Sequence, residues 1–450
     1  MGALGQRYLH TIITNFLLKL VVGLAISVVT ARALGPSGRG EYNLVVLVIT
    51  LMTTLLNFGI PASNTYFVAQ KKIGKEKLLK ASFLIAVAVS LLSFVLLYVL
   101  FSFGLLKYLF PVETLTPAAI ASLAIIPVVF FNLFAQGIIV GENKIYLNNY
   151  IYLASQTCLA VTLTVAYLLG FLSVSLSIVL FAVSNFVAFA IIVFSYRSII
   201  FTPSSSAMGW GEYKQVFGFS IVLQAGNIIQ FFNYRLDTFL VNIYLGTMSV
   251  GLYVLAVNLV EILWILSSSM ASVLLPTVAG KHEFSKKIAV KAAIASFAVT
   301  LGAGILALPL APYAITFLFG KEFAGSIMPF FILLPGVTLF SITNVLAAYM
   351  TGVGKPGFNT GIALVALVFT ILLDIALIPR FGISGAAFAS SVSYTILTLL
   401  SLWIFVRLSG LTWAECIEFA RSFKDDLRSM RSRAGLKLRT VISTNRTNGL

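Results

Sequence analysis

Long apolar runs separated by short polar segments follow one another along the chain. Most runs reach roughly 18 residues or more, which an apolar helix needs to cross a bilayer, and they lack the alternation typical of barrel strands. The pattern predicts an all-α polytopic membrane protein with about twelve transmembrane helices. The predicted spans are 10–33, 42–69, 79–106, 116–140, 148–169, 173–195, 216–245, 249–279, 290–309, 326–351, 358–378 and 384–406.

A short pattern, L-G-x-x-x-x-G-x-Y, occurs twice, from Leu34 to Tyr42 and from Leu245 to Tyr253. The two occurrences are 211 residues apart, and several further matches share this offset: Gly141 with Gly352, Lys144 with Lys355, and Asn148 with Asn359. Matches in the same order at one offset indicate two tandem copies of one unit. A period this long is typical of duplicated transporters, whose substrate sites lie between the repeats.

Composition and charge exclude a water-soluble fold. The chain is 59% hydrophobic and 10% charged, with a mean hydropathy of +1.02, whereas soluble domains carry roughly 25% charged residues. The net charge of +16 is unevenly distributed: 23 of the 30 Lys and Arg lie in or at the edges of segments on one side, 5 lie on the other side, and 2, Lys19 and Arg235, lie deep within spans. The positive-inside rule therefore predicts a multi-pass protein of the plasma membrane with both termini cytoplasmic. No nucleic-acid-binding motif accompanies the charge, so nucleic acid is not expected as a partner.

Four regions are expected along the chain. Residues 1–196 form an N-terminal six-helix lobe, 197–214 a cytoplasmic linker rich in Ser, Pro and Gly, and 215–408 a C-terminal six-helix lobe. An even number of spans makes both lobes enter from the cytoplasm, so the lobes are expected to be parallel and related by an axis along the membrane normal. Residues 409–450 form a basic cytoplasmic tail.

The tail begins with an amphipathic pattern that is too polar to span a membrane. We expect this helix either to lie along the cytoplasmic leaflet or to pack on the lobes, and both alternatives stay open. Its apolar positions recur in steps of three and four: Trp413, Cys416, Ala420, Phe423, Leu427 and Met430.

Signatures of catalysis and of metal or cofactor binding are missing from the sequence. There is no P-loop and no paired metal-binding carboxylate motif. Cys158 and Cys416 suggest neither a disulfide framework nor a thiolate site, and His10 and His282 are far apart in sequence. We therefore expect no enzyme, no metal and no cofactor.

The span 216–245 carries a polar stripe. At roughly 100° per residue, seven polar residues fall within one sector of the helix. A lipid-facing helix would not carry this stripe, and one helix contact does not need so many polar groups, so the pattern favours a water-filled cavity. The seven are Ser220, Gln224, Asn227, Tyr234, Arg235, Thr238 and Asn242, with Gln230 and Asp237 beyond the edge.

Charged residues inside the spans are the strongest candidates for function, because a charge in the bilayer core costs roughly 2.5–3.5 kcal/mol. They mark a substrate or ion pathway, or they pair within a core that never meets substrate, and the sequence leaves both interpretations open. Asp237 could meet Lys19 or share a proton with Glu261. The five are Lys19, Arg235, Asp237, Glu261 and Asp374.

Three stretches resemble the polysaccharide-unit flippases of the multidrug/oligosaccharidyl-lipid/polysaccharide exporter superfamily. Arg32 to Pro36 with Gly40 and Tyr42 resembles their R-x-L-G-P…G-x-Y signature. Tyr234 to Asp237 followed by Leu245 to Tyr253 resembles their R-x-D…L-G…G-x-Y stretch, and Ile378 to Ala387 their I-P-x-x-G-x-x-G-A-A turn. The resemblance implies two six-helix bundles in a V that rock to give alternating access. Asp374, where the family often has Asn, and the long basic tail depart from it.

With this resemblance, the sequence predicts a flippase for a lipid-linked oligosaccharide, acting in cell-surface polysaccharide or glycan biosynthesis. The alternatives are a small-molecule drug/cation antiporter of the same architecture and an intramembrane glycan polymerase or transferase. The expected partners are the lipid-linked glycan, membrane lipids and polysaccharide-assembly proteins, around a monomer. Asp237, Glu261 and Asp374 are expected to couple transport or balance charge, and six residues to bind phosphate or glycan: Asn15, Lys19, Gln224, Asn227, Tyr234 and Arg235.

Overall fold

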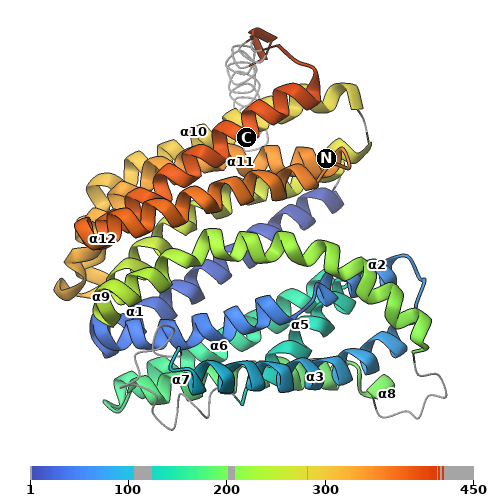
Figure 1. Ribbon diagram of the computed structural model, residues 1–450, viewed down its shortest axis with the longest axis horizontal. Coiled ribbons are helices and arrows are strands. Elements are labelled where there is room, and N and C mark those ends of the chain that lie inside the picture. The colour runs from blue at the N-terminus through green and yellow to red at the C-terminus, as the bar shows by residue number, and fades with distance from the viewer. Residues whose placement is uncertain are drawn as a thin grey trace, which may run out of the picture. The chain divides into compact units, whose positions relative to one another are not determined.

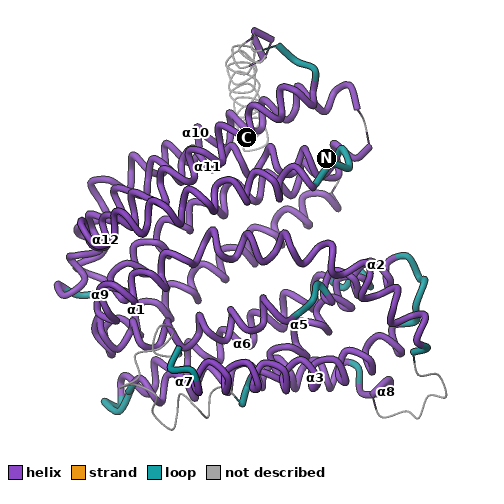
Figure 2. The backbone as a smooth tube through the Cα atoms, in the orientation of Figure 1, coloured by secondary structure: helices purple, strands orange, loops and turns teal. Residues whose placement is uncertain are grey.

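The chain is almost entirely helical where the structure describes it. The computed structural model describes residues 3–105, 124–200, 208–280, 282–412, 414–415 and 418–419, and these contain no strand (Figures 1 and 2). The elements are α1 (Ala3–Leu56), α2 (Ile60–Ala69), α3 (Lys75–Ser102), α5 (Ile126–Gly141), α6 (Ile145–Leu168), α7 (Val174–Ser195), α8 (Arg197–Ile200), α9 (Trp210–Gly280), α10 (His282–Ala314), η3 (Ile315–Phe319), η4 (Lys321–Ser326), α11 (Ile327–Gly352) and α12 (Gly357–Ser409).

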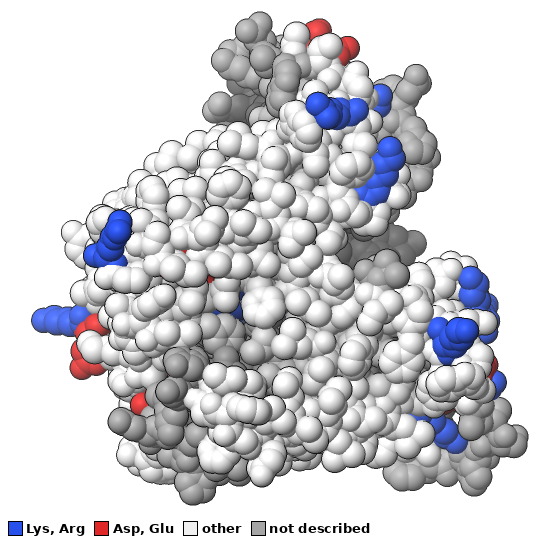
Figure 3. Space-filling view, viewed as in Figure 1, with Lys and Arg blue, Asp and Glu red and all other residues white. Residues whose placement is uncertain are grey.

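Eight of the described helices are long and apolar enough to cross a membrane. In the face that Figure 3 shows, most of the described surface is neither acidic nor basic, as a bilayer-facing surface requires. These features confirm the prediction of an all-α, multi-pass membrane protein. The number of crossings and the side of each terminus stay predictions.

Three of these helices are too long for one crossing, and each contains one glycine with non-helical backbone. The glycines are Gly35 in α1, Gly246 in α9 and Gly382 in α12. All three have positive φ, which costs glycine little and other residues much. Each falls between two spans that the hydrophobic pattern separates.

The two copies of the repeated motif contact each other reciprocally. A methyl group on Gly40 would lie 1.9 Å from the carbonyl oxygen of Thr247, and one on Gly251 would lie 1.9 Å from that of Pro36. Pro36 and Thr247 are 211 residues apart, as are Gly40 and Gly251. Gly35 and Gly246 share nearly the same dihedral angles, with φ of 63° and 78°. Two copies related by a two-fold rotation would make this contact.

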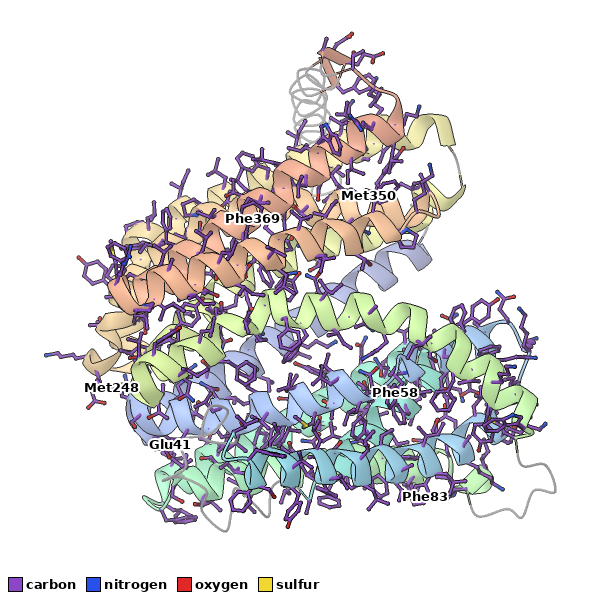
Figure 4. The ribbon with its side chains drawn as sticks, viewed as in Figure 1. Glu41, Phe58, Phe83, Met248, Met350 and Phe369 are labelled. Carbon is purple, nitrogen blue, oxygen red and sulfur yellow. The ribbon has the colours of Figure 1, made fainter. Side chains whose placement is uncertain are left out.

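A second helix break lies in the first copy, between α1 and α2, whereas the equivalent residues 268–270 of the second copy are described as helix within α9. Phe58 and Gly59 both have left-handed φ, of 49° and 72°, and the side chain of Asn57 accepts a hydrogen bond of 2.8 Å from the Gly59 amide (Figure 4). Pro61 stands in the first turn of α2. A methyl group on Gly59 would lie 2.3 Å from the carbonyl oxygen of Ser220, so the break brings two backbones into contact.

The chain divides into two compact units that differ from the expected lobes. One unit comprises Met1–Leu259, Leu308–Leu333 and Ala363–Ser390, and the other Val260–Ala307, Leu334–Ile362 and Ser391–Leu450. The boundaries of the two lobes and of the linker stay predictions. Most of the amphipathic pattern of the tail lies outside the described residues, so its location also stays a prediction.

Each unit is held by buried polar contacts between helices as well as by apolar packing. In the first unit, the Asn64 amide donates to Ser82 and to the backbone of Phe134, which joins α2, α3 and α5. In the second unit, Asn344 donates to Ser267 over 2.7 Å. Such interhelical hydrogen bonds and close contacts between small residues hold membrane helices together where the hydrophobic effect is weak.

Candidate functional site

Lys19 is a half-buried cation in α1 that is held by neutral groups. Its ammonium donates a hydrogen bond of 2.9 Å to the side-chain oxygen of Asn149 and lies 4.8 Å from the centre of the Tyr152 ring, both in α6. Within the described part of the chain, no carboxylate forms an ion pair with it. Neutral groups, and not a carboxylate, are thus the described partners of Lys19. The side chain of Asn15, expected on the same stripe, lies outside the described side chains.

Asp237 is fully engaged by hydrogen-bond donors in the interior of the same unit. Tyr253 donates to one carboxylate oxygen over 2.5 Å, and Ser390 donates to that oxygen over 3.1 Å. The backbone amide of Thr238 donates to the other oxygen over 2.6 Å. These donors come from both halves of α9 and from α12, so the carboxylate connects three helical segments.

Asp374 is a second acid beside this network, and it has no hydrogen-bond partner among the described residues. It is 0% exposed, and it lies within electrostatic range of Asp237 and Tyr253. Arg235, two residues before Asp237, is the opposite charge that acts on Asp237. Burying two like charges is unfavourable, so the pair is suited to hold a proton or a small cation.

The polar stripe of α9 divides into a packed end and an accessible middle. The Gln224 amide donates to the backbone oxygen of Thr54, next to the helix break after Leu56, and the Asn57 amide donates to the same oxygen over 3.3 Å. Asn227 is exposed, and Tyr234 and Arg235 are half-buried. Only the middle of the stripe can meet a ligand directly, while Gln224 is engaged in contact with another helix.

Among the described residues, Asp237 does not contact Lys19, the first of its two expected partners. Asp237 and Lys19 each have the other partners named above, and Glu261 belongs to the other compact unit, where it is half-buried. A pairing of Asp237 with Glu261 stays a prediction. Sequence reasoning missed Asn149, Tyr152 and Ser390, because uncharged residues of these types occur throughout apolar helices. Only Tyr253 carried a signal, as part of the repeated motif.

Arg39 lies in a segment that the predicted spans place outside the membrane, yet it is 2% exposed within α1. Its guanidinium donates to the backbone and side-chain oxygens of Ser27 over 3.2 and 2.7 Å. The rings of Phe319 and Phe323 lie 5.6 and 5.7 Å from it. Arg39 thus packs inside the unit next to the reciprocal contact made by Gly40.

A separate ionic cluster surrounds Glu142, after the end of α5. Lys75 and Lys144 lie 2.7 and 3.0 Å from its carboxylate, and the Tyr196 hydroxyl donates to it. Burial opposes ionisation, but the hydrogen bonds from Lys75, Tyr196 and Lys144 lower the pKa of Glu142 to about 2. Burial first and then Glu142 raise the pKa of Tyr196 above its ordinary range. The ion pairs and hydrogen bonds of this cluster connect α3, the end of α5 and the end of α7.

Comparisons with known proteins agree with the architecture. A family model described as "Polysaccharide biosynthesis protein" matches residues 9–282. Over 192 residues, the chain is 23% identical to the probable low-salt glycan biosynthesis flippase Agl15 of Haloferax volcanii. That match covers 42% of this chain and 41% of Agl15, so it spans less than half the length of that relative.

Solved structures of transporters share the fold over nearly the whole chain. The lipid II flippase MurJ in an inward closed conformation has a TM-score of 0.72 at 16% identity, covering 94% of this chain and 93% of MurJ. An inward-facing multidrug resistance MATE family transporter of the MOP superfamily has a TM-score of 0.66 at 14% identity, covering 87% of this chain and 96% of that one. The predicted fold class is thereby confirmed: the chain shares its fold with these transporters of the MOP superfamily.

Proposed function

Because the chain belongs to the polysaccharide biosynthesis protein family, we propose that it is a flippase for a lipid-linked oligosaccharide. The substrate is a glycan on a polyprenyl phosphate or diphosphate, which moves from the cytoplasmic to the outer leaflet. The glycan passes through a central cavity by alternating access of the two lobes, while the lipid tail stays in the bilayer. The protein acts as a monomer beside polysaccharide-assembly proteins.

The observation that carries this proposal is the state of Lys19. The described partners of this half-buried ammonium are an amide and an aromatic ring, so no described carboxylate neutralises it. A cation within a membrane helix is costly without a function. Arg235, half-buried on the accessible part of the α9 stripe, supplies a planar fork that fits phosphate oxygens. Lys19 and Arg235 bind the phosphates, and Asn227 and Tyr234 contact the glycan.

The proposed role of Asp237 and Asp374 is to couple transport of the substrate to binding of an ion. A carboxylate that is fully buried without a described hydrogen-bond partner, beside a second carboxylate, is suited to bind a proton or Na⁺. This acidic pair is also the observation that favours the second candidate, a drug/cation antiporter of the same fold. The antiporter would use the same pair but would have no need of Lys19.

Export assays of site variants test the proposal. In cells whose glycan export depends on this chain, Arg235→Ala and Lys19→Ala abolish export while the protein still accumulates in the membrane. Arg235→Lys recovers only part, because a point charge cannot make a two-pronged contact. Rescue of Arg235→Ala by Asp237→Asn or Glu261→Gln would instead make Arg235 a structural counter-ion. Drug resistance that depends on the chain, with unchanged glycan export, would favour the antiporter.

A further inference from the structure

We propose that Asn149 and Tyr152 are positioning residues that hold the Lys19 ammonium in place without neutralising it, so that its charge remains for a substrate phosphate. This inference rests on the proposed function and deepens it. It assigns a role to two uncharged residues of α6 that the sequence did not single out.

The position of the two residues fixes the ammonium from one side. Asn149 and Tyr152 are three residues apart on α6, so their side chains project from neighbouring positions on one face of the helix. The amide oxygen accepts one N–H of Lys19 at 2.9 Å, and the ring lies under the ammonium at 4.8 Å. A flexible lysine chain is thereby held at a defined place between α1 and α6.

Charge and burial together distinguish this lysine from other lysines of the same unit. Lys72, which contacts the hydroxyl and the ring of Tyr66, also has no described carboxylate partner, but it is exposed and lies outside the predicted spans. Lys75 and Lys144 lie against Glu142, and Lys77 lies 2.9 Å from Glu212, so a carboxylate offsets each positive charge. Lys19 has an amide in the corresponding place. An amide orients the ammonium by a hydrogen bond but leaves the net charge at +1, whereas a carboxylate would compete with phosphate.

The donors and the exposure of the cluster leave room for a ligand. A lysine ammonium has three N–H donors and no acceptor. One donor reaches Asn149 and one faces the Tyr152 ring, where the cation–π attraction uses no lone pair. No other described acceptor takes the third N–H, which under the proposal binds a phosphate oxygen. Lys19 is half-buried and Tyr152 is 45% exposed, so a phosphate can approach without displacing either neutral partner.

The decisive variant is Asn149→Asp, which is nearly isosteric but adds a carboxylate against Lys19. If Asn149 only stabilised the fold, an ion pair in its place would leave ligand binding unchanged. Under the proposal, the new charge neutralises Lys19, so affinity for a phosphate ligand falls at least about tenfold, while the melting temperature stays equal or rises. Tyr146→Asp, at a 76% exposed position on the same helix, controls for a new charge that does not touch Lys19.

The ring is tested separately. Tyr152→Phe retains the aromatic face and is expected to bind normally, whereas Tyr152→Leu loses it and is expected to bind about two- to fivefold more weakly. Tyr150→Leu removes an exposed tyrosine with no described contact to Lys19, and is expected to leave binding unchanged. These variants decide the question even if Asn149→Asp does not accumulate.

Binding is measured on the full-length protein in lipid nanodiscs. The probes are farnesyl diphosphate, inorganic diphosphate and, as an uncharged counterpart, farnesol. Wild-type affinity for the diphosphates, lost in Asn149→Asp and Tyr152→Leu with farnesol binding unchanged, supports the proposal. Equal diphosphate binding by wild type and Asn149→Asp overturns the positioning role and leaves the proposed function standing. Absence of diphosphate binding by the wild type contradicts both.

Discussion

Tyr42 and Tyr253 occupy equivalent places in the two copies, yet their surroundings carry opposite charge. Both are buried, and each follows the kinked glycine of its copy by seven residues. Tyr253 meets Asp237 and Ser390, with Asp374 close by. Tyr42 instead has a cation, Arg39, within electrostatic range.

Residues that are 211 positions apart show how the surroundings of the two tyrosines differ. Position 26 holds Ile where Asp237 stands in the second copy, and Arg39 corresponds to Val250. Ser27, the partner of Arg39, corresponds to Thr238, whose amide binds Asp237. The backbone contact through Gly40 and Gly251 thus stayed alike, while the buried charge became basic in one copy and acidic in the other. Backbone geometry constrains the contact, and the charge of neighbouring side chains can change without disturbing it.

The largest effect is expected where the copies are alike. Gly40→Ala and Gly251→Ala each place a methyl group 1.9 Å from a backbone oxygen, which cannot move aside as a side chain could. Each substitution should lower the free energy of unfolding by about 3 kcal/mol or more, beyond ordinary overpacking. Thermal unfolding in detergent measures the loss.

Gly218→Ala is the matched control, because nothing lies within 4 Å of a methyl group at that exposed helical position. It should leave stability unchanged or raise it slightly, by up to about 1 kcal/mol. Clearly unequal losses for Gly40→Ala and Gly251→Ala would contradict the reciprocity of the contact.

The next largest loss of stability is expected at Asp237, which corresponds to Ile26 in the first copy. Asp237→Ile gives the second copy the residue of the first and removes the acceptor of Tyr253, Ser390 and the Thr238 amide. Buried donors without a partner cost about 1–3 kcal/mol each. Because Tyr253 and Ser390 can still bond each other, we expect a total loss of about 2 kcal/mol. A double-mutant cycle with Tyr253→Phe should show coupling, and strict additivity would exclude the hydrogen bond as the cause.

A smaller effect is expected at Glu142, which corresponds to Val353 in the second copy, although Lys144 and Lys355 are both lysines. Glu142→Gln should cost about 1–2 kcal/mol, less than the shifted pKa alone would give, because water screens part of the cluster. The pKa of Glu142 is about 2 when folded, against an ordinary value of 4.5.

The pH dependence of this loss has a definite sign. A depressed folded-state pKa contributes stability that is complete above the unfolded value and disappears as the pH falls through the folded value. The difference between wild type and Glu142→Gln should therefore be constant above about pH 5 and shrink between about 4.5 and 2. Denaturant unfolding across this range measures it, and a difference independent of pH would assign the loss to packing.

The smallest effect is expected at Arg39. Its two described acceptors both belong to Ser27, so Arg39→Met leaves no buried anion behind. Replacing a buried charge by an apolar side chain of similar length is often neutral. We expect the free energy of unfolding to change by less than about 1 kcal/mol, as measured beside Asp237→Ile. A loss as large as that of Asp237→Ile would show that Arg39 stabilises the first copy as the acid stabilises the second.

The sequence predicted those features that depend on period and spacing. Apolar runs marked the helices and the gaps between spans, and the repeated motif marked two equivalent places. The structure puts a glycine with positive φ at each, Gly35 and Gly246, a conformation that favours glycine. Side-chain neighbours across helices were not predictable. A helical wheel gives the face on which Gln224 lies but not the helix opposite, and so its contact with the Thr54 carbonyl could not be foreseen. The burial of Arg39 was missed because a span boundary drawn from hydropathy ends at charges.

The reciprocal glycine contact also bears on the origin of the chain. A half-length ancestor making the same contact would be a symmetric homodimer, in which one glycine serves both sides of the interface. A single substitution in such a homodimer would change both sides of the interface, so the position would tolerate few residues other than glycine. In the present chain the two sides are Gly40 and Gly251, and the residues beside each can change independently. The two halves of the contact could then acquire opposite charges, with Arg39 beside one half and Asp237 and Asp374 beside the other.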